Sequence, residues 1–208
     1  MKPAVLLLLA TALSATAAEY SCTLTGSKRE PVTDAVVSLI PLDAAPPPVP
    51  ANASVEIAQQ DQEFTAYVTV VQTGTKVVFP NHDTVQHHVY SLSKPKKFEL
   101  PLYNPGQAES LVFDLPGLVT VGCNIHDWMI THLVVVPTPW FAKSDSQGLA
   151  RITAPAGRYR LEIWHPRGAA AAKELTLADN VPVQEAITLA LKPDRRVRRP
   201  LGSKSGGY

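Results

Sequence analysis

The chain has few cysteines and no long apolar run beyond its first residues. Only Cys22 and Cys123 occur among 208 residues, which excludes a scaffold held together by many disulfide bonds. After residue 18, no stretch contains the roughly 20 consecutive apolar residues that a membrane-spanning helix needs. The formal net charge of +1 gives no overall basic character, so we expect no binding to nucleic acid.

The sequence also lacks the ~3.6-residue periodicity of long amphipathic helices. Short runs rich in Val, Ile, Thr, Tyr and Phe recur instead, bounded by Gly, Pro, Asn and Asp. They cover residues 35–40, 67–71, 75–79, 88–92, 118–121 and 133–136. Many short strands with frequent turn signals predict an all-β fold, either a sandwich or a barrel. The pair Thr73 and Gly74 marks a tight turn between two of these strands.

The first 18 residues have the pattern of a secretory signal peptide. Lys2 precedes an apolar run at residues 4–10, and residues 15–18 offer a cleavage site of the A-x-A type, as such signals require. The apolar run is too short to anchor the chain in a membrane. We therefore expect an exported, periplasmic protein from which residues 1–18 are removed.

Two proline-containing stretches divide the rest of the chain. Residues 44–50 are rich in proline and alanine and predict a stiff linker, because proline fixes φ and removes a hydrogen-bond donor. A second boundary lies near residues 137–139. We therefore expect a β-rich domain at residues 51–137, flanked by residues 19–50 and 138–191.

The two flanks are predicted to form one small sandwich together. A D-x-x-G turn at residues 145–148 leads into a strand, and a P-x-G-x-Y pattern starts another at Pro155. In the second strand Tyr159, Leu161 and Ile163 alternate on one face, as a half-buried strand requires. Two strands are not stable alone, so the N-terminal strands would complete the module. The middle domain would then be an insertion at an exposed turn.

The C-terminal segment, residues 192–208, is basic. It contains six basic residues and one acidic residue, whereas the rest of the exported chain is acidic. With its Gly- and Ser-rich end, this segment is predicted to be a disordered tail. Such a tail is suited to contact an acidic partner or anionic lipid, and a simply solvated tail is the other interpretation.

One loop concentrates residues that bind soft metals. Cys123, His126 and Met129 follow one another with the spacing Cys-x2-His-x2-Met. A further ligand must come from another strand, where His87 and His88 are the candidates. Two imidazoles, one thiolate and a weakly bound thioether are the ligands of a mononuclear blue-copper centre.

A disulfide bond with Cys22 is the alternative role for Cys123. It would leave the spacing of the following histidine and methionine unexplained, so copper ligation accounts for more of the pattern. Strand alternation places Val119, Val121 and Cys123 on one face, which directs the sulfur into the core. Cys22 is then expected to be a small buried residue.

The wider pattern resembles the cupredoxins. It runs Asn81-x5-His87-x-Val89, then Pro116-Gly117, then the Cys-x2-His-x2-Met loop, and this short loop is most similar to that of amicyanin, with plastocyanin more distant. The sequence segments at residues 79–81, 87–90, 98–100 and 122–129 also resemble segments of exported bacterial proteins called methylamine utilization proteins. The flanks resemble Ig-like or transthyretin-like modules of the carboxypeptidase regulatory type. The resemblance implies a cupredoxin-like Greek-key β-sandwich beside a small Ig-like one.

The resemblance to cupredoxins also implies a ligand set for one type 1 copper ion: His87, Cys123, His126 and Met129. His88 stands where cupredoxins usually have asparagine, so it is a rival ligand or a neighbour of the site, as is Asn81. Because successive residues of a strand point to opposite faces, His87 and His88 are not both expected to reach one metal ion.

An electron carrier is the leading functional hypothesis. No open coordination position, general base or nucleophile is evident, so we do not expect an enzyme. A redox partner protein would dock near Ile125, His126 and Trp128, since redox encounters need only small interfaces. Two alternatives are copper handling without electron transfer, suggested by the additional histidines His82 and His88, and an Ig-like binding module that carries the cupredoxin fold as a scaffold.

Overall fold

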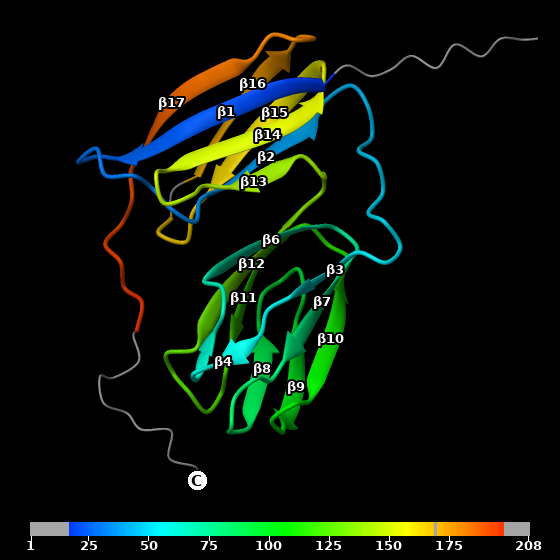
Figure 1. Ribbon diagram of the computed structural model, residues 1–208, viewed down its shortest axis with the longest axis vertical. Helices are drawn as coiled ribbons and strands as arrows, with labels where there is room; N and C mark the ends of the chain where they lie inside the picture. The colour runs from blue at the N-terminus through cyan, green and yellow to red at the C-terminus, as the bar shows by residue number, and fades with distance from the viewer. Residues whose placement is uncertain (1–16, 169, 198–208) are drawn as a thin grey trace, which may run out of the picture.

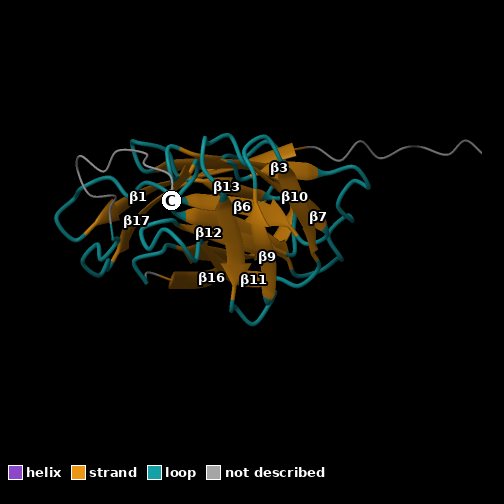
Figure 2. Cartoon of the chain, turned by 90° about the horizontal axis from the view of Figure 1, so that it is seen from below, coloured by secondary structure: helices purple, strands orange, loops and turns teal. Residues whose placement is uncertain are grey.

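The computed structural model describes residues 17–168 and 170–197, and within them it contains strands and loops only. The expected all-β sandwich architecture is confirmed: Figure 1 shows two stacked β-sandwiches, and Figure 2 shows strands and loops without a helix. No helix within these ranges is long and apolar enough to cross a membrane. The predicted signal peptide lies outside the described residues except for Ala17 and Ala18. These two alanines already belong to the first strand, so the predicted boundary after residue 18 falls inside that strand.

The upper sandwich in Figure 1 combines strands from both ends of the described chain. One sheet has the order β14-β1-β17, with β1 at Ala17–Gly26, β14 at Leu149–Pro155 and β17 at Val183–Leu189. The other has the order β13-β2-β15-β16, with β2 at Val36–Pro41, β13 at Phe141–Lys143, β15 at Gly157–Trp164 and β16 at Ala170–Leu177. Strand β1 is antiparallel to β14 and parallel to β17. Both flanks of the sequence therefore contribute to each sheet.

The lower sandwich is formed by the segment between β2 and β13. Its larger sheet has the order β6-β12-β11-β8-β9, with β6 at Val68–Gln72, β8 at His87–Ser91, β9 at Phe98–Tyr103, β11 at Gly117–Gly122 and β12 at Ile130–Val136. The facing sheet, β10-β7-β3, uses β3 at Ser54–Glu56, β7 at Thr75–Pro80 and β10 at Ala108–Phe113. A short hairpin pairs β4, Gln59–Gln60, with β5, Glu63–Phe64. The expected turn at Gly74, with φ +92°, joins β6 to β7 and so carries the chain from one sheet to the other.

Each sandwich has its own hydrophobic core. In the upper one, Tyr159, Leu161 and Ile163 of β15 are buried, as their alternation predicted. In the lower one, Val119 and Val121 of β11 are fully buried and Cys123 continues the same face. Burying a valine or leucine side chain stabilises the fold by roughly 1.5–3 kcal/mol, so these alternating positions fix which face of each strand points inward.

Strand β12 is buried on both faces because the two sandwiches pack against each other there. Leu133 and Val135 point into the lower core, whereas Val134 and Val136 belong to a separate apolar cluster shared with Val36 of β2. The unbroken apolar run at residues 133–136 thus reflects burial on both faces of the sheet. The upper sandwich packs against the outer face of the five-stranded sheet, from which the loop at residues 123–129 extends.

The start of the predicted basic tail makes defined contacts. The Arg196 guanidinium lies 4.0 Å from the centre of the Tyr67 ring and pairs with Asp194 at 2.8 Å. Arg167 donates from Nε to the Lys192 carbonyl oxygen at 2.5 Å. These contacts differ from the prediction of disorder from residue 192 onward, because residues 192–197 run from the upper sandwich to the lower one. Residues 198–208 lie outside the described part of the chain.

The two cysteines are free and lie in different cores. A disulfide bond between them is thereby excluded, and Cys22 is confirmed as a buried residue, 1% exposed. Burial raises the pKa of the Cys22 thiol to about 11. The thiol is therefore protonated at neutral pH, and a buried, protonated thiol is a poor nucleophile.

We predict that Cys22 resists alkylation in the folded protein. In a Cys123→Ser variant, where Cys22 is the remaining thiol, a maleimide at neutral pH should react at least roughly 100-fold more slowly than after unfolding in urea, because reaction needs an opened core. Mass spectrometry of timed samples measures both rates. Equal rates before and after unfolding would contradict the burial of this side chain.

Candidate metal centre

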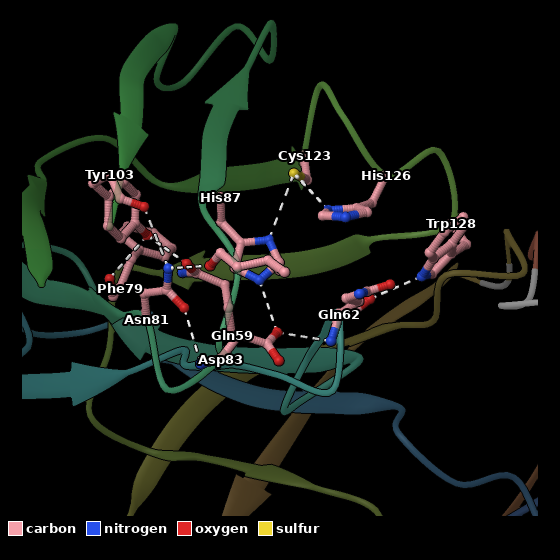
Figure 3. A network of polar contacts seen from close by, with 11 residues as sticks. Gln59, Gln62, Phe79, Asn81, Asp83, His87, Tyr103, Cys123, His126 and Trp128 are labelled. Carbon is pink, nitrogen blue, oxygen red and sulfur yellow. Dashed lines mark hydrogen bonds and ion pairs between the residues drawn. The ribbon is translucent and has the colours of Figure 1, made fainter. Parts of the chain in front are cut away.

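His87, Cys123 and His126 come together where β11 ends and β8 begins (Figure 3). His87 is the first residue of β8, Cys123 directly follows β11, and His126 lies in the loop between β11 and β12. One nitrogen or sulfur atom from each residue lies within 4.8 Å of the other two. Three of the four predicted ligands are therefore neighbours in space.

Both imidazoles turn the same ring nitrogen toward the sulfur. The Nδ1 atom of His87 lies 3.9 Å from Cys123 Sγ, and that of His126 lies 3.6 Å from it. Two ligand atoms that bind one metal ion at about 2.0–2.3 Å in tetrahedral geometry lie about 3.5 Å apart. The donor atoms are thus spaced as ligands of a single ion. His87 is fully buried and Cys123 is 5% exposed, whereas His126 is partly exposed.

A largely buried carboxylate, that of Asp83, fixes the orientation of His87. Asp83 Oδ2 lies 2.7 Å from His87 Nε2, and the Asp83 side chain is only 10% exposed. A carboxylate oxygen accepts hydrogen bonds, so the proton sits on Nε2 and the lone pair of Nδ1 faces Cys123. This arrangement is the one that a metal-binding histidine needs. The sequence interpretation missed Asp83, although a carboxylate four residues before the histidine was the available signal.

Asn81 supports the loop that carries Asp83. Its Nδ2 donates to the carbonyl oxygens of Val85, at 2.9 Å, and Tyr103, at 3.3 Å, and its Oδ1 accepts from the Asp83 backbone N–H at 2.9 Å. The side chain is fully buried and all its contacts are within the protein framework. Asn81 therefore positions the loop and lies outside the group of ligand atoms.

His88 points away from the group formed by His87, Cys123 and His126. Its Nε2 lies 3.0 Å from Glu99 Oε1 on the neighbouring strand β9, and its ring lies 5.7 Å from that of Tyr90. The opposite orientations of His87 and His88 follow from the alternation of side chains along β8. His82 is exposed, and the three-residue group includes neither of these additional histidines.

Two backbone hydrogen bonds at Met129 close the loop that contains Cys123 and His126. The Cys123 N–H donates to the Met129 carbonyl oxygen at 3.1 Å, and the Met129 N–H donates to the His126 carbonyl oxygen at 2.9 Å. The Met129 side chain is 1% exposed and belongs to the same core cluster as Cys123. The loop therefore has a fixed path between its three potential ligands.

The hairpin turn at Asp61 and Gln62 connects the loop to Asp83. The Gln62 N–H donates to Asp83 Oδ2 at 2.7 Å, and its carbonyl oxygen accepts from Trp128 Nε1 at 2.8 Å (Figure 3). Both turn residues have φ +56°, the left-handed conformation that two-residue hairpins require and that glycine or asparagine usually supplies. A strained turn therefore aims one donor and one acceptor at the site.

Comparisons with known proteins show similarity to copper proteins at low identity. No protein-family model matches the chain, and neither does any curated protein. Among solved structures, the novel purple cupredoxin from Nitrosopumilus maritimus is 23% identical, covers 40% of this chain and 99% of its own, and has a TM-score of 0.35. Amicyanin from Paracoccus versutus is 21% identical, with 42% and 85% covered and a TM-score of 0.38.

A Cu-containing nitrite reductase from Thermus scotoductus SA-01 is also similar. It is 23% identical, with 46% of this chain and 25% of its own covered and a TM-score of 0.38. Each of these three structures matches less than half of this chain. None of these three structures bears on the narrower resemblance to methylamine utilization proteins.

We predict that Asp83 contributes to metal affinity through His87. Asp83→Ala should weaken Cu(II) binding about 10–100-fold, the usual effect of removing the carboxylate behind a metal-binding histidine. Asp83→Asn, which keeps an oxygen that can accept the hydrogen bond from His87, should lose less Cu(II) affinity than Asp83→Ala. Competition with a chelator of known affinity measures both constants.

Asp114→Ala is the matched control, because this aspartate is 66% exposed and pairs with Lys96. It should leave the affinity for Cu(II) unchanged. If a correctly folded Asp83→Ala variant, as judged by circular dichroism, bound Cu(II) as tightly as the parent protein, the carboxylate would have no role in holding the imidazole.

Proposed function

We propose that this protein is an exported type 1 copper protein that carries electrons rather than an enzyme. The residues that would hold one copper ion are His87, Cys123, His126 and, more weakly, Met129. The observation that carries the proposal is the orientation of two imidazole Nδ1 atoms toward one buried cysteine sulfur. Two imidazoles, a thiolate and a long thioether contact are the donors that copper takes in such sites, where it alternates between Cu(I) and Cu(II).

Rigid support of the ligands favours electron transfer. Asp83 holds the His87 ring, and backbone hydrogen bonds connect Cys123 and His126 through Met129. Cys123 packs in the lower core, where close packing leaves little room for rearrangement. Ligands that keep their positions when the charge of the site changes would lower the cost of each transfer.

The exposed side of the site would receive the redox partner. His126 is the partly exposed member of the group, and Ile125 beside it is 49% exposed. The ring of Trp128 lies 5.5 Å from that of His126. A small apolar rim of this kind suits the transient interfaces of redox proteins. The predicted signal peptide, residues 1–18, would direct the protein to the periplasm, where such a partner would be met.

We predict a strong visible absorption band for the Cu(II)-loaded protein. Charge transfer from the Cys123 thiolate to Cu(II) in a trigonal site with two histidines gives a blue or green colour. Cys123→Ser should abolish the band, and His87→Ala should abolish or shift it. Visible and EPR spectra of the loaded proteins provide the measurement.

His88→Ala is the matched control for His87→Ala, since the two histidines are neighbours in sequence but point in opposite directions. It should leave the band in place. A colourless Cu(II) complex, or a band that persists in Cys123→Ser, would overturn the ligand assignment.

Electrochemistry distinguishes electron transfer from copper handling. The copper-loaded protein on an electrode should give a reversible one-electron wave, because the ligands stay in place in both oxidation states. Cys123→Ser should give no such wave. Rapid loss of copper to a chelator together with an irreversible wave would favour storage or delivery instead.

A further inference from the structure

A cleft of about 770 Å³ lies between the two sandwiches, next to the metal-binding loop. Its lower wall is formed by apolar and aromatic side chains, including Phe64, Tyr67, Trp128 and Met129. Residues 166–168 and 192–197, which descend from the upper sandwich (Figure 1), form the opposite wall. A volume of this size, at an interface between domains, is typical of sites for small organic molecules.

Basic side chains dominate the upper wall. Arg167, Lys192, Arg195 and Arg196 line the cleft, against the acidic residues Glu63 and Asp194. Asp194 pairs with Arg196, whereas the side chains of Lys192 and Arg195 form no ion pair or hydrogen bond with another residue in the described ranges. Two lining cations without a carboxylate partner, at a cleft whose other wall is largely apolar, favour an anionic ligand.

The aromatic wall favours a planar ligand. The guanidinium carbon of Arg196 lies 4.0 Å from the centre of the Tyr67 ring, so a cation–π contact already forms on this wall. The Tyr67 and His132 rings meet edge to face at 5.2 Å and complete the surface. Burial lowers the pKa of His132, so this imidazole adds an uncharged ring rather than a further cation at neutral pH.

Only the Trp128 ring separates the cleft from the candidate metal ligand His126. The His126 ring lies 5.0 Å from the His87 ring and 5.5 Å from the Trp128 ring, and Trp128 lines the cleft. A ligand against Trp128 would therefore lie beside the metal centre.

We propose that this cleft is a binding site for a planar aromatic anion, such as an aromatic carboxylate, held between the aromatic lower wall and the side chains of Lys192 and Arg195. Binding depends on side chains of the cleft and needs no copper, so this proposal and the proposed function fail independently.

The experiment is calorimetric titration of the metal-free, full-length folded protein with naphthoate and with its neutral isostere naphthamide. We expect naphthoate to bind once per chain and at least tenfold more tightly than naphthamide, with an affinity that falls as salt is added. The double variant Lys192→Gln/Arg195→Gln should reduce naphthoate binding at least tenfold and leave naphthamide binding unchanged.

Lys94→Gln/Lys97→Gln is the matched control, because these two exposed lysines lie on the β8–β9 loop away from the cleft. It removes the same charge and should leave both affinities unchanged. Absence of naphthoate binding, equal affinity for the two probes, or equal losses in the two double variants would each overturn the proposal.

Discussion

The hydrogen bond between Asp83 and His87 is the contact on which the candidate metal centre depends. It determines which ring nitrogen of His87 carries the proton, and therefore which one is free to face Cys123. The same carboxylate accepts from the Gln62 backbone, whose carbonyl group holds Trp128. One partly buried acid thus connects the first histidine, a strained hairpin turn and the loop that supplies the other potential ligands.

Much of this arrangement follows from local rules of β structure. The two-residue period of a strand predicts that Val119, Val121 and Cys123 share the core face, and that His87 and His88 face opposite ways. Frequent turn signals between short apolar runs predict an all-β fold, and strands β2, β6, β7, β8, β11 and β12 lie within three residues of the six runs. The other strands, among them β9, β10, β16 and β17, match none of these runs. These features depend on neighbouring residues, so a single sequence contains the information for them.

The remaining features depend on contacts between distant segments. Asp83 lies in a loop, where no periodicity indicates whether a side chain is buried, and its importance comes from Gln62 and His87. The placement of residues 192–197 arises from Arg196 meeting Tyr67, which is 129 residues earlier in the sequence. The unbroken apolar run of β12 is the local signal that both faces of its sheet are covered. Such a run does not identify the upper sandwich as the part that covers the outer face.

The pairing of β13 with β2 has a consequence for how the chain assembles. These strands are adjacent in the upper sandwich, yet β2 ends at Pro41 and β13 begins at Phe141. Bringing them together in an unfolded chain requires closing a loop of the whole middle segment, which costs conformational entropy before any contact is gained. Once the lower sandwich has formed, the chain segments that enter and leave it bring β2 and β13 close enough to pair. Loop-closure entropy therefore favours folding of the middle segment, which contains the candidate metal centre, before the pairing of β13 with β2.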